Sequence, residues 1–475
     1  MKKLVILLVI ILLCLVTWAG ATYVVGSKIE ANYTTLLEKY PRFGPVTLTG
    51  RNYQRGFLGS TAETVLHFKV PASAQPEGQQ DRPESLEIVL THTLKHGPLA
   101  GAAPALTLIE TRLTEINING EPQDDFFNNI PQMQEPLALT KVGFDGTTQS
   151  HVQISPFTIE EDDGQITWEG FNMDSEYSPG SKTINGTLST PGMKIAMPDG
   201  HMNWQGLSGH FEITEALPML YVGPQEMTVG AFDMDFPSSS AAENKKISMD
   251  EIKITSDSQF DGKQVHYQQF MQFAGIDIDG ETYGPGSIDI ELKNLEAQPL
   301  SDFQAQVQEI YFGPDSLDPD LLLARLLPLY SQLFVDLGTG EPELLINKLT
   351  FATPMGNIDG RAQVKYNGQG EEVLAVSGAL LQNLEASADL AVDESLVSGI
   401  MAANISKKLT QARNDGLLPD YSDEDIATMA EQQLQSQIEA LLLQNLIVRD
   451  GQTLKSSAVF NQGQLEVNGQ MLPLF

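Results

Sequence analysis

Two histidines four residues apart are the most suggestive chemical feature of the sequence. His92 and His96 have the i, i+4 spacing with which a helix presents two ligands to zinc. In that motif a glutamate follows the first histidine as general base, but here Thr93 takes its place. The apolar residues of Leu86–Leu94 also alternate, which favours a strand over a helix. We therefore predict no metal site here, and the other histidines stand singly, as structural side chains usually do.

Other motifs with catalytic or metal-binding potential are incomplete. The segment Gly206–His210 reads G-L-S-G-H and lacks the G-x-S-x-G spacing of a nucleophile elbow. Asp257–Gly262 begins like a calcium loop, but Gln259 replaces a ligand and Gln268 stands where the bidentate glutamate belongs. The sequence therefore predicts no catalytic residue, no cofactor and no enzyme. A glycosidase needs only two carboxylates placed by the fold, and a chain with 62 acidic residues leaves that alternative open.

An uncharged apolar stretch near the N-terminus determines the expected location. Leu4–Val25 contains 22 residues without a charge, and a transmembrane helix needs about 20. Lys2 and Lys3 precede it, and positive residues stay on the cytoplasmic side. We predict a cytoplasmic stub at residues 1–3, a single-pass inner-membrane signal anchor at 4–25, and a body in the periplasm or its equivalent.

A cleaved signal peptide is the alternative for this stretch, with the same topology. Ala19 and Ala21 have the A-x-A spacing that signal peptidase recognises. However, the apolar run continues to Val25, whereas the apolar part of a signal peptide usually has about 7–15 residues. Cys14, the only cysteine, lies within the run, so the exported part has no thiolate for catalysis or metal binding.

The acidic composition restricts the partners of the exported body. The formal net charge is −34 and the pI is about 4.4. Nucleic acid and anionic lipid headgroups would be repelled by such a surface. We therefore predict no nucleic-acid partner.

The first part of the body is predicted to change from helix to strand. Lys28–Tyr40 has apolar residues at helical spacing and continues from the anchor as an amphipathic helix. Val46–Asn52, Thr64–Val70 and Leu86–Leu94 have strand character. Pro71–Ser85 is polar and contains proline, which indicates a loop between two of these strands.

A short alternating strand that ends in glycine recurs through the chain. It occurs at Val142–Gly146, Ile166–Gly170, Thr183–Gly186, Met202–Gly206, Ile276–Gly280, Gly356–Gly360 and Leu465–Gly469. Glycine after Asn or Asp supplies the positive φ of tight hairpin turns, so we expect strand ends in a long antiparallel meander. The fold predicted is α+β and β-dominated, with one or more long twisted sheets that have one apolar face.

Helices are expected mainly in the C-terminal third. Their predicted ranges are Pro299–Tyr311, Pro319–Leu337, Asp393–Arg413 and a helix from Ser422 capped with Asp425, and Pro328 should kink or shorten the second. Leu446–Phe475 returns to strands, which should rejoin the main sheet because a few strands are unstable alone. We therefore expect a β-rich body over residues 26–298 and a mixed helix and strand part over 299–475 of the same body.

Several short motifs occur together in one order. They are R-N-Y-Q-R-G and H-G-P-L, the passage from Ile278 to Leu295, and the ending V-N-G-Q-M-L-P-L. With the anchor, they make the chain resemble the bacterial YdgA-like family, whose domain has no known function. The resemblance implies a Gram-negative envelope protein with a periplasmic body, and it brings no catalytic residues. The matching positions, of open role, are Tyr53, Arg55, Gly56, Ser60, His96, Gly97, Pro98, Leu99, Tyr283, Gly284, Pro285, Gly286, Asn468, Gly469 and Pro473.

Two functions of different class are compatible with these patterns. One is a structural or scaffolding protein that self-associates or docks envelope partners. The other is a binding module that holds phospholipid or another apolar ligand against a concave sheet face, and an envelope hydrolase is a third, weaker alternative. Arg55 is predicted either to brace the structure through a carboxylate or to hold an anionic ligand headgroup.

Overall fold

The structure is a computed structural model that divides the chain into two compact units. Unit 1 comprises residues 1–227 and 301–330, and unit 2 comprises 228–300 and 331–475. The structure describes residues 22, 27–35, 37–38, 42–43, 46–69, 85–101, 103–161, 164–237, 244–311, 319–368, 381–419 and 421–473. Almost all of the predicted anchor at Leu4–Val25 and of the predicted loop at Pro71–Ser85 lies outside the described residues.

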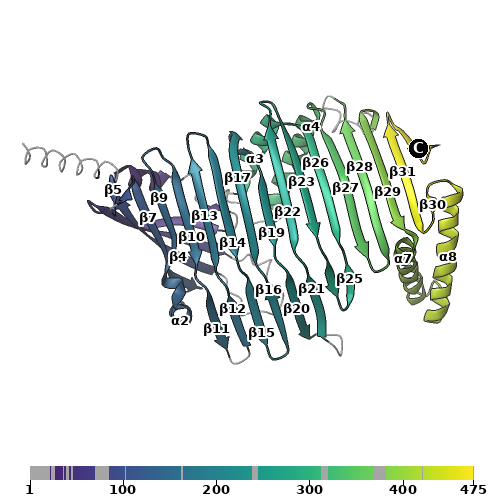
Figure 1. Ribbon diagram of the computed structural model, residues 1–475, viewed down its shortest axis with the longest axis horizontal. Helices are drawn as coiled ribbons and strands as arrows, with labels where there is room; N and C mark the ends of the chain where they lie inside the picture. The colour runs from purple at the N-terminus through teal and green to yellow at the C-terminus, as the bar shows by residue number, and fades with distance from the viewer. Residues whose placement is uncertain are drawn as a thin grey trace, which may run out of the picture. The chain divides into compact units, whose positions relative to one another are not determined.

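Unit 1 contains a long antiparallel sheet in which each strand pairs with the next in the chain. Its strands are, in order, β1 (Arg42–Phe43), β2 (Val46–Arg55), β3 (Gly59–Lys69), β4 (Ser85–His96), β7 (Thr107–Ile118), β9 (Pro136–Val142), β10 (Thr148–Ile154), β13 (Phe171–Ser178), β14 (Thr183–Thr190) and β17 (Leu207–Leu217). Shorter strands flank it, namely β5 (Leu99–Ala100), β6 (Ala103–Pro104), β8 (Glu121–Pro122), β18 (Leu220–Val222) and β19 (Gln225–Val229). The predicted meander is therefore confirmed for this unit (Figure 1).

A second, smaller sheet of unit 1 is formed by extensions of these strands. It contains β11 (Phe157–Glu161), β12 (Gly164–Trp168), β15 (Met193–Met197) and β16 (Gly200–Trp204). Each extension joins its parent strand at a bend that contains Pro156, Gly170, Gly192 or Gly206. At Gly206 φ is +88°, and a Cβ would overlap the carbonyl oxygen of Thr190.

These bends correct part of the glycine prediction. Gly170 and Gly206 mark bends within long strands rather than hairpin ends. Gly186 and Gly360 lie inside strands, and Gly186 leaves room for the ring of Phe211 on the neighbouring strand. The hairpin prediction is confirmed for Gly146, Gly280 and Gly469, which lie in short turns between paired strands and have positive φ.

Unit 2 shows a similar arrangement of long and short strands. Its long strands are β22 (Ile252–Phe260), β23 (Gln264–Phe273), β26 (Gly286–Glu296), β27 (Glu343–Thr353), β28 (Gly356–Tyr366), β29 (Leu384–Asp393), β31 (Thr453–Asn461), β32 (Gln464–Val467) and β33 (Gln470–Leu472), paired in that order, with β30 (Val448–Asp450) beside β31. The short strands β20 (Phe232–Pro237), β21 (Asn244–Met249), β24 (Ile276–Ile278) and β25 (Glu281–Tyr283) form its small sheet. The C-terminal strands β31 to β33 thus pair within the sheet of unit 2.

Four described helices lie close to their predicted ranges, namely α3 (Ala297–Tyr311), α4 (Pro319–Gly338), α7 (Glu394–Asn414) and α8 (Asp423–Leu443). Residues 27–35 and 37–38 are also helical, in the region of the predicted helix Lys28–Tyr40, and are called the N-terminal helix below. The short α2 (Asp124–Asn129) and the 3-10 helix η2 (Pro131–Gln134) were not predicted. The expectation that Pro328 shortens its helix is wrong, because α4 continues through it. Ala324, whose carbonyl loses its partner at Pro328, is exposed and can bond water. The change from strand to helix expected near residue 298 occurs at Ala297, within unit 2.

The best-buried apolar cluster of unit 2 lies between α7 and α8. Ile405 of α7 packs with Ala430, Leu434 and Ile438 of α8, and Ile438 is completely buried. Ser422 and Asp425 form the predicted capping box at the start of α8. This helix pair, rather than the sheet, therefore provides the deepest described packing of unit 2.

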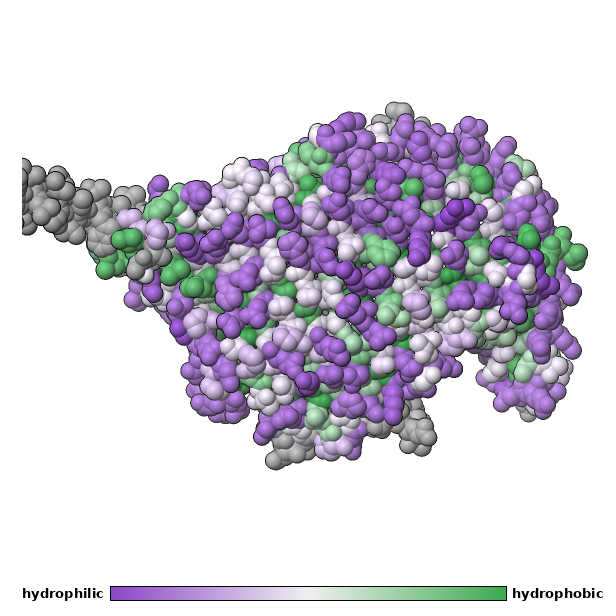
Figure 2. Space-filling model, viewed as in Figure 1, coloured by the Kyte–Doolittle hydropathy of each residue, from purple (hydrophilic) through white to green (hydrophobic). Residues whose placement is uncertain are grey.

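Alternation gives the sheet of each unit a polar face and an apolar face. In unit 2, Asp359 and Arg361 of β28 lie on the opposite face from Ile358, and Arg361 forms an ion pair with Asp389 of β29. Figure 2 shows a predominantly hydrophilic surface over the strands of both units. The alternation on β28 thus gives the sheet of unit 2 the apolar face expected from the sequence.

Candidate functional site

The first eight family-like positions, from Tyr53 to Leu99, lie together in unit 1. They are at the end of the sheet where the β2–β3 hairpin turns and β4 ends. Arg55 of β2 pairs with Ser60 of β3, and the backbone NH of Gly56 donates to the carbonyl of Gly59 across the hairpin (2.8 Å). The backbone NH of His96 donates to the carbonyl of Leu58 (2.9 Å). The two motifs, although about forty residues apart, therefore form one structural corner.

Close backbone packing explains the glycines of this corner. A Cβ at Gly97 would overlap the carbonyl oxygen of Ala105, and one at Gly59 would come within 2.5 Å of the carbonyl oxygen of Leu94. The peptide between Gly97 and Pro98 is cis. Larger residues at either glycine would force neighbouring strands apart.

Ser60 and His96 form a hydrogen bond inside this corner. The Ser60 hydroxyl lies 2.9 Å from Nε2 of His96, and the two residues are only 4% and 2% exposed. Burial lowers the pKa of His96, so the imidazole is kept neutral. A serine beside a histidine suggests a nucleophile and its base, but a substrate has no access to a pair this deeply buried. The pair fits a structural role.

A second line of polar contacts joins the N-terminal helix to the sheet. The hydroxyl of Tyr33 donates to the carbonyl of Glu63 (2.7 Å) and lies 3.1 Å from the hydroxyl of Thr64. Nε2 of His92 lies 2.9 Å from the hydroxyl of Thr64, and Nδ1 of His92 lies 2.9 Å from the hydroxyl of Thr111. Both ring nitrogens of His92 are thus occupied, so the two histidines at zinc spacing bind hydroxyl groups instead.

Arg55 reaches the same helix. One guanidinium nitrogen lies 3.0 Å from a carboxylate oxygen of Glu30. This is the carboxylate brace that the sequence offered as one of two roles. Asn52, with φ +56°, makes a bulge in β2 before Tyr53, and the rings of Tyr53 and Tyr33 pack with centroids 5.6 Å apart.

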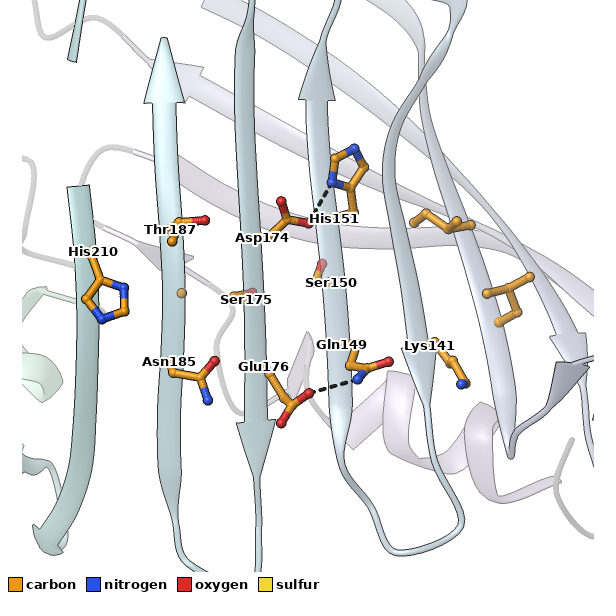
Figure 3. Close-up of a pocket in the computed structure, with 13 residues that line it drawn as sticks. Lys141, Gln149, Ser150, His151, Asp174, Ser175, Glu176, Asn185, Thr187 and His210 are labelled. Atoms are coloured by element: carbon orange, nitrogen blue, oxygen red, sulfur yellow. Dashed lines mark hydrogen bonds and ion pairs between the residues drawn. The ribbon is translucent and has the colours of Figure 1, made fainter. Parts of the chain in front are cut away.

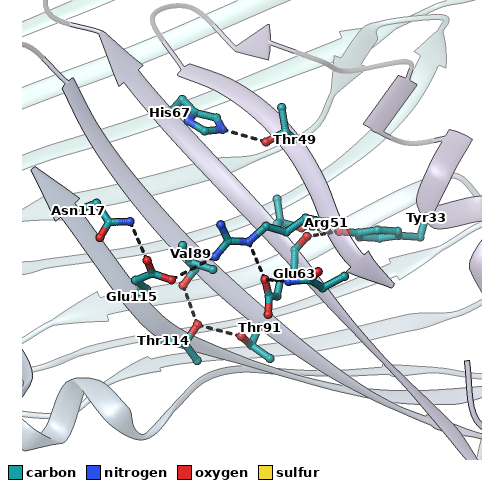
Figure 4. Close-up of polar contacts among 12 residues, drawn as sticks. Tyr33, Thr49, Arg51, Glu63, His67, Val89, Thr91, Thr114, Glu115 and Asn117 are labelled. Carbon is teal, nitrogen blue, oxygen red and sulfur yellow. Dashed lines mark hydrogen bonds and ion pairs between the residues drawn. The ribbon is translucent and has the colours of Figure 1, made fainter. Parts of the chain in front are cut away.

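A cluster of charged groups covers the same strands (Figure 4). Arg51 bonds Glu63 through Nε (2.6 Å) and Glu115 through Nη2 (3.1 Å). The hydrogen bond from Arg51 lowers the pKa of Glu63, and Asn52 adds a second donor. Because Arg51 already binds two carboxylates, this cluster stabilises the strands rather than offering a free cation to a ligand.

Unit 1 contains a shallow hollow of about 540 Å³ that is lined mainly by polar residues (Figure 3). Its side chains form rows across β9, β10, β13, β14 and β17. In one row Nδ1 of His151 lies 2.8 Å from Asp174, followed by Thr187 and His210 on the next strands. In the neighbouring row Gln149 donates to Glu176 (2.8 Å).

This hollow lacks the arrangement that a hydrolase needs. His151 binds a carboxylate, but the serine hydroxyl next to it in sequence, that of Ser150, is paired with Thr140 (2.9 Å). His151 and Asp174 are also 45% and 68% exposed, so water would weaken any charge effect between them. Among the described residues, no three His, Cys, Asp or Glu side chains are grouped to hold a metal ion.

The remaining family-like positions lie in unit 2, in two places. Tyr283, Gly284, Pro285 and Gly286 form the bend between β25 and β26, which contains a second cis Gly-Pro peptide. Asn468 and Gly469 form the turn between β32 and β33, and Pro473 follows β33 and is exposed. The side chain of Asn468 accepts from the backbone NH of Ser457 and donates to the carbonyl of Asn445. These positions shape the backbone and form no common site.

Sequence reasoning missed a second hollow, on the apolar face of unit 2. It measures about 340 Å³ and is lined by Met271, Phe273, Ile288, Leu349, Phe351 and Ile358 from four adjacent strands, together with Ser287 and Thr350. The hydroxyls of Ser287 and Thr350 bond each other (2.7 Å). None of the six apolar side chains is fully buried. The alternation I-D-I-E-L in Ile288–Leu292 was the sequence feature that could have indicated this apolar face.

The apolar face extends along the sheet beyond this hollow. Ile290 pairs with Ile346, and Ile346 pairs with Ala362. On the next strand Leu390, which pairs with Gly360 of the same face, is 45% exposed. α7 contacts β28 and β29. A broad part of it therefore stays partly open to solvent.

One described helix has the length and composition to cross a membrane. It is Leu321–Gly338 within α4, of which only 6% is buried. However, the strands before and after the α3–α4 segment, β26 and β27, pair directly with each other. A crossing by α4 alone would place paired strands on opposite sides of a membrane, so α4 does not cross as a single span.

Comparison with known proteins places the chain among relatives from bacteria. The chain is 19% identical to Protein YdgA of Escherichia coli (strain K12) over 505 aligned positions, which cover 97% of this chain and 92% of that protein. Residues 1–475 match the bacterial family described as a protein of unknown function, DUF945. Because this match spans the whole length, the chain belongs to the DUF945 family.

Proposed function

We propose that this protein is a non-enzymatic binding module held in the inner membrane by residues 4–25, with its body in the periplasm. Its ligand is the acyl portion of a phospholipid, which lies against the apolar face of unit 2. The observation that carries this proposal is the partly exposed hollow formed by Met271, Phe273, Ile288 and their neighbours.

Leaving this face in water is unfavourable. Complete burial of one Leu, Ile, Phe or Met side chain stabilises a protein by about 1.5–3 kcal/mol. Six such side chains in the hollow are only partly buried, and Leu344 and Leu390 on the same face are 38% and 45% exposed. Exposed apolar patches of this kind mark binding surfaces in soluble domains.

The chemistry of the hollow favours an acyl chain over other ligands. Six of its eight lining residues have aliphatic, aromatic or thioether side chains, and the hydroxyls of the other two, Ser287 and Thr350, bond each other. A polar or charged ligand would lose its hydration there without gaining hydrogen bonds. The proposed anchor keeps the body beside a membrane, which is a reservoir of acyl chains.

Photocrosslinking at neighbouring positions of β26 tests the proposal. Ile288 points into the hollow, and Asp289, the next residue, lies on the polar face of the same strand. The photoreactive residue p-benzoylphenylalanine would be placed at either position of the full chain, in vesicles of phosphatidylethanolamine and phosphatidylglycerol. After irradiation, mass spectrometry should find a phospholipid adduct at position 288 and none at 289.

Other outcomes favour other functions. Protein–protein adducts at position 288 would support the scaffolding alternative, in which a second copy covers the face. Equal lipid adducts at both positions would mean that the strand contacts lipid without a selective face, and the binding proposal would fail. Absence of any adduct at 288 would also contradict it.

A further inference from the structure

The corner built by the family-like motifs ends in exposed apolar side chains. Phe57 and Leu58, at the apex of the β2–β3 hairpin, are 50% and 57% exposed, and Leu99, after the Gly97-Pro98 peptide, is 55% exposed. These three residues are called the tip below. The backbone bond between His96 and Leu58 places both segments at the same end of the sheet.

The tip is rigidly supported, which is unusual for exposed apolar loop residues. Ser60 and His96 are bonded and buried beneath it, and the glycines at 59 and 97 pack against neighbouring backbone. A hairpin needs no such support merely to turn. The support therefore favours a surface that must be presented in a fixed position.

Contacts along β2 show which way the tip points. An added methyl group at Gly50 would overlap Leu37 of the N-terminal helix, whereas Tyr53 packs on Tyr33 and Arg55 bonds Glu30. Moving along β2 toward the tip therefore means moving along the helix toward its start. That start directly follows the predicted anchor in the sequence.

The tip reaches at least as far as the described start of the N-terminal helix. The apex lies two residues beyond the Arg55–Ser60 pair, or about 7 Å at strand rise. Ser27, the first described residue of the helix, lies three residues before Glu30, or about 4.5 Å at helix rise. The predicted anchor ends two residues before Ser27 in the sequence.

We propose that Phe57, Leu58 and Leu99 insert into the bilayer interface beside the anchor and fix the orientation of unit 1 on the membrane. This inference rests on the proposed membrane tether and is independent of lipid binding by unit 2. Apolar side chains that insert about 5–10 Å into the boundary between headgroups and acyl chains bind there because their apolar surface is buried. The tip contacts lipid rather than another protein in this proposal, because the helix that packs along β2 continues toward the predicted membrane anchor.

Fluorescence quenching in the full chain tests this. Cys14→Ser removes the only cysteine, so single cysteines can be labelled with an environment-sensitive dye. The probes are Leu58→Cys at the tip, Thr49→Cys as an exposed matched control earlier in β2, and Val25→Cys at the end of the anchor. The protein would be reconstituted in phosphatidylcholine vesicles with or without brominated acyl chains.

The probe at 58 should lose about half of its emission in brominated vesicles, as expected for a group at interface depth, while the probe at 49 stays unchanged. Quenching at 25 but not at 58 would overturn the tip proposal and leave the tether intact. Absence of quenching at both would overturn the tether and the tip proposal together. A blue-shifted probe at 58 that bromine does not quench would show a protein contact, such as a second copy, and also overturn the proposal.

A combined variant provides a second measurement. Phe57→Ser with Leu58→Ser keeps the hairpin but removes most of the apolar surface of the tip. A probe at Leu99→Cys should then lose its quenching by brominated lipid. Unchanged quenching at 99 in this variant would show that the tip side chains do not hold unit 1 to the surface.

Discussion

At the scale of single residues, buried histidines make the stability of unit 1 depend on pH. Burial lowers the pKa of His96, whereas the unfolded chain titrates near pH 6.5. Below about pH 6.5 the unfolded state therefore binds a proton that the folded state does not, and the free energy of unfolding decreases as the pH falls. Urea unfolding of the full chain in detergent, followed by the fluorescence of Trp168 and Trp204 in unit 1, should show this decrease.

His96→Gln is the control for this prediction. Glutamine retains a hydrogen-bonding group for Ser60 but does not titrate near neutral pH. The variant should lose part of the pH dependence, with the remainder due to His92, whose pKa burial also lowers. A variant with the full pH dependence of the parent protein would show that His96 is not its source.

Gly97 offers a second test at this scale. In Gly97→Ala the new methyl group would overlap the carbonyl oxygen of Ala105, and overpacking of this kind costs about 1–3 kcal/mol. Gly180→Ala is the matched control, because nothing lies within 4 Å of a Cβ there. Urea unfolding should show a lower midpoint for Gly97→Ala alone, and equal midpoints for the two variants would contradict the close-packing argument.

At the scale of elements, the pairing of α7 with α8 determines how unit 2 is stabilised. Ile438 is completely buried between these helices, and Ile→Ala at such sites lowers the free energy of unfolding by about 2–5 kcal/mol. Leu443, at the end of α8, is 88% exposed. Leu443→Ala should therefore change the free energy of unfolding by less than about 0.5 kcal/mol.

Hydrogen exchange is the suitable measurement for these two variants of unit 2. The fluorescence of Trp168 and Trp204 reports on unit 1 and would not detect a change in α7 or α8. Ile438→Ala should accelerate amide exchange in α7 and α8, while Leu443→Ala should leave it unchanged. Equal exchange in the two variants would mean that the helix pair does not depend on this contact.

At the scale of the whole molecule, the C-terminal strands belong to the structure of unit 2 rather than to a separate tail. β31 pairs with β29 along nine residues, and Leu454 and Val467 are buried. Asn445 and Asn468 also exchange two hydrogen bonds between side chains and backbone. Removing residues 446–475 should therefore accelerate hydrogen exchange throughout β28 and β29. Unchanged protection of those strands would show that unit 2 is complete without its C-terminus.

Features governed by local chemistry were predictable from the sequence alone. The alternation in β26 indicated a strand with two unlike faces, and Asn468-Gly469 indicated a tight turn. Ser422 and Asp425, which are three residues apart, predicted the start of α8 through a capping box. In each case the residues that determine the structure are close neighbours, so no knowledge of distant parts was needed.

Only the tertiary structure decided which distant residues meet and which surfaces remain open. Ser60 and His96 are joined by the register of β3 on β4, and a shift of one residue would place them on opposite faces. The glycines at 170 and 206 look like turn residues, but strand pairing on both sides makes them bends. Likewise, alternation predicts that Ile288 lies on an apolar face, but its exposure depends on whether another element packs there, and that depends on contacts between segments far apart in the chain.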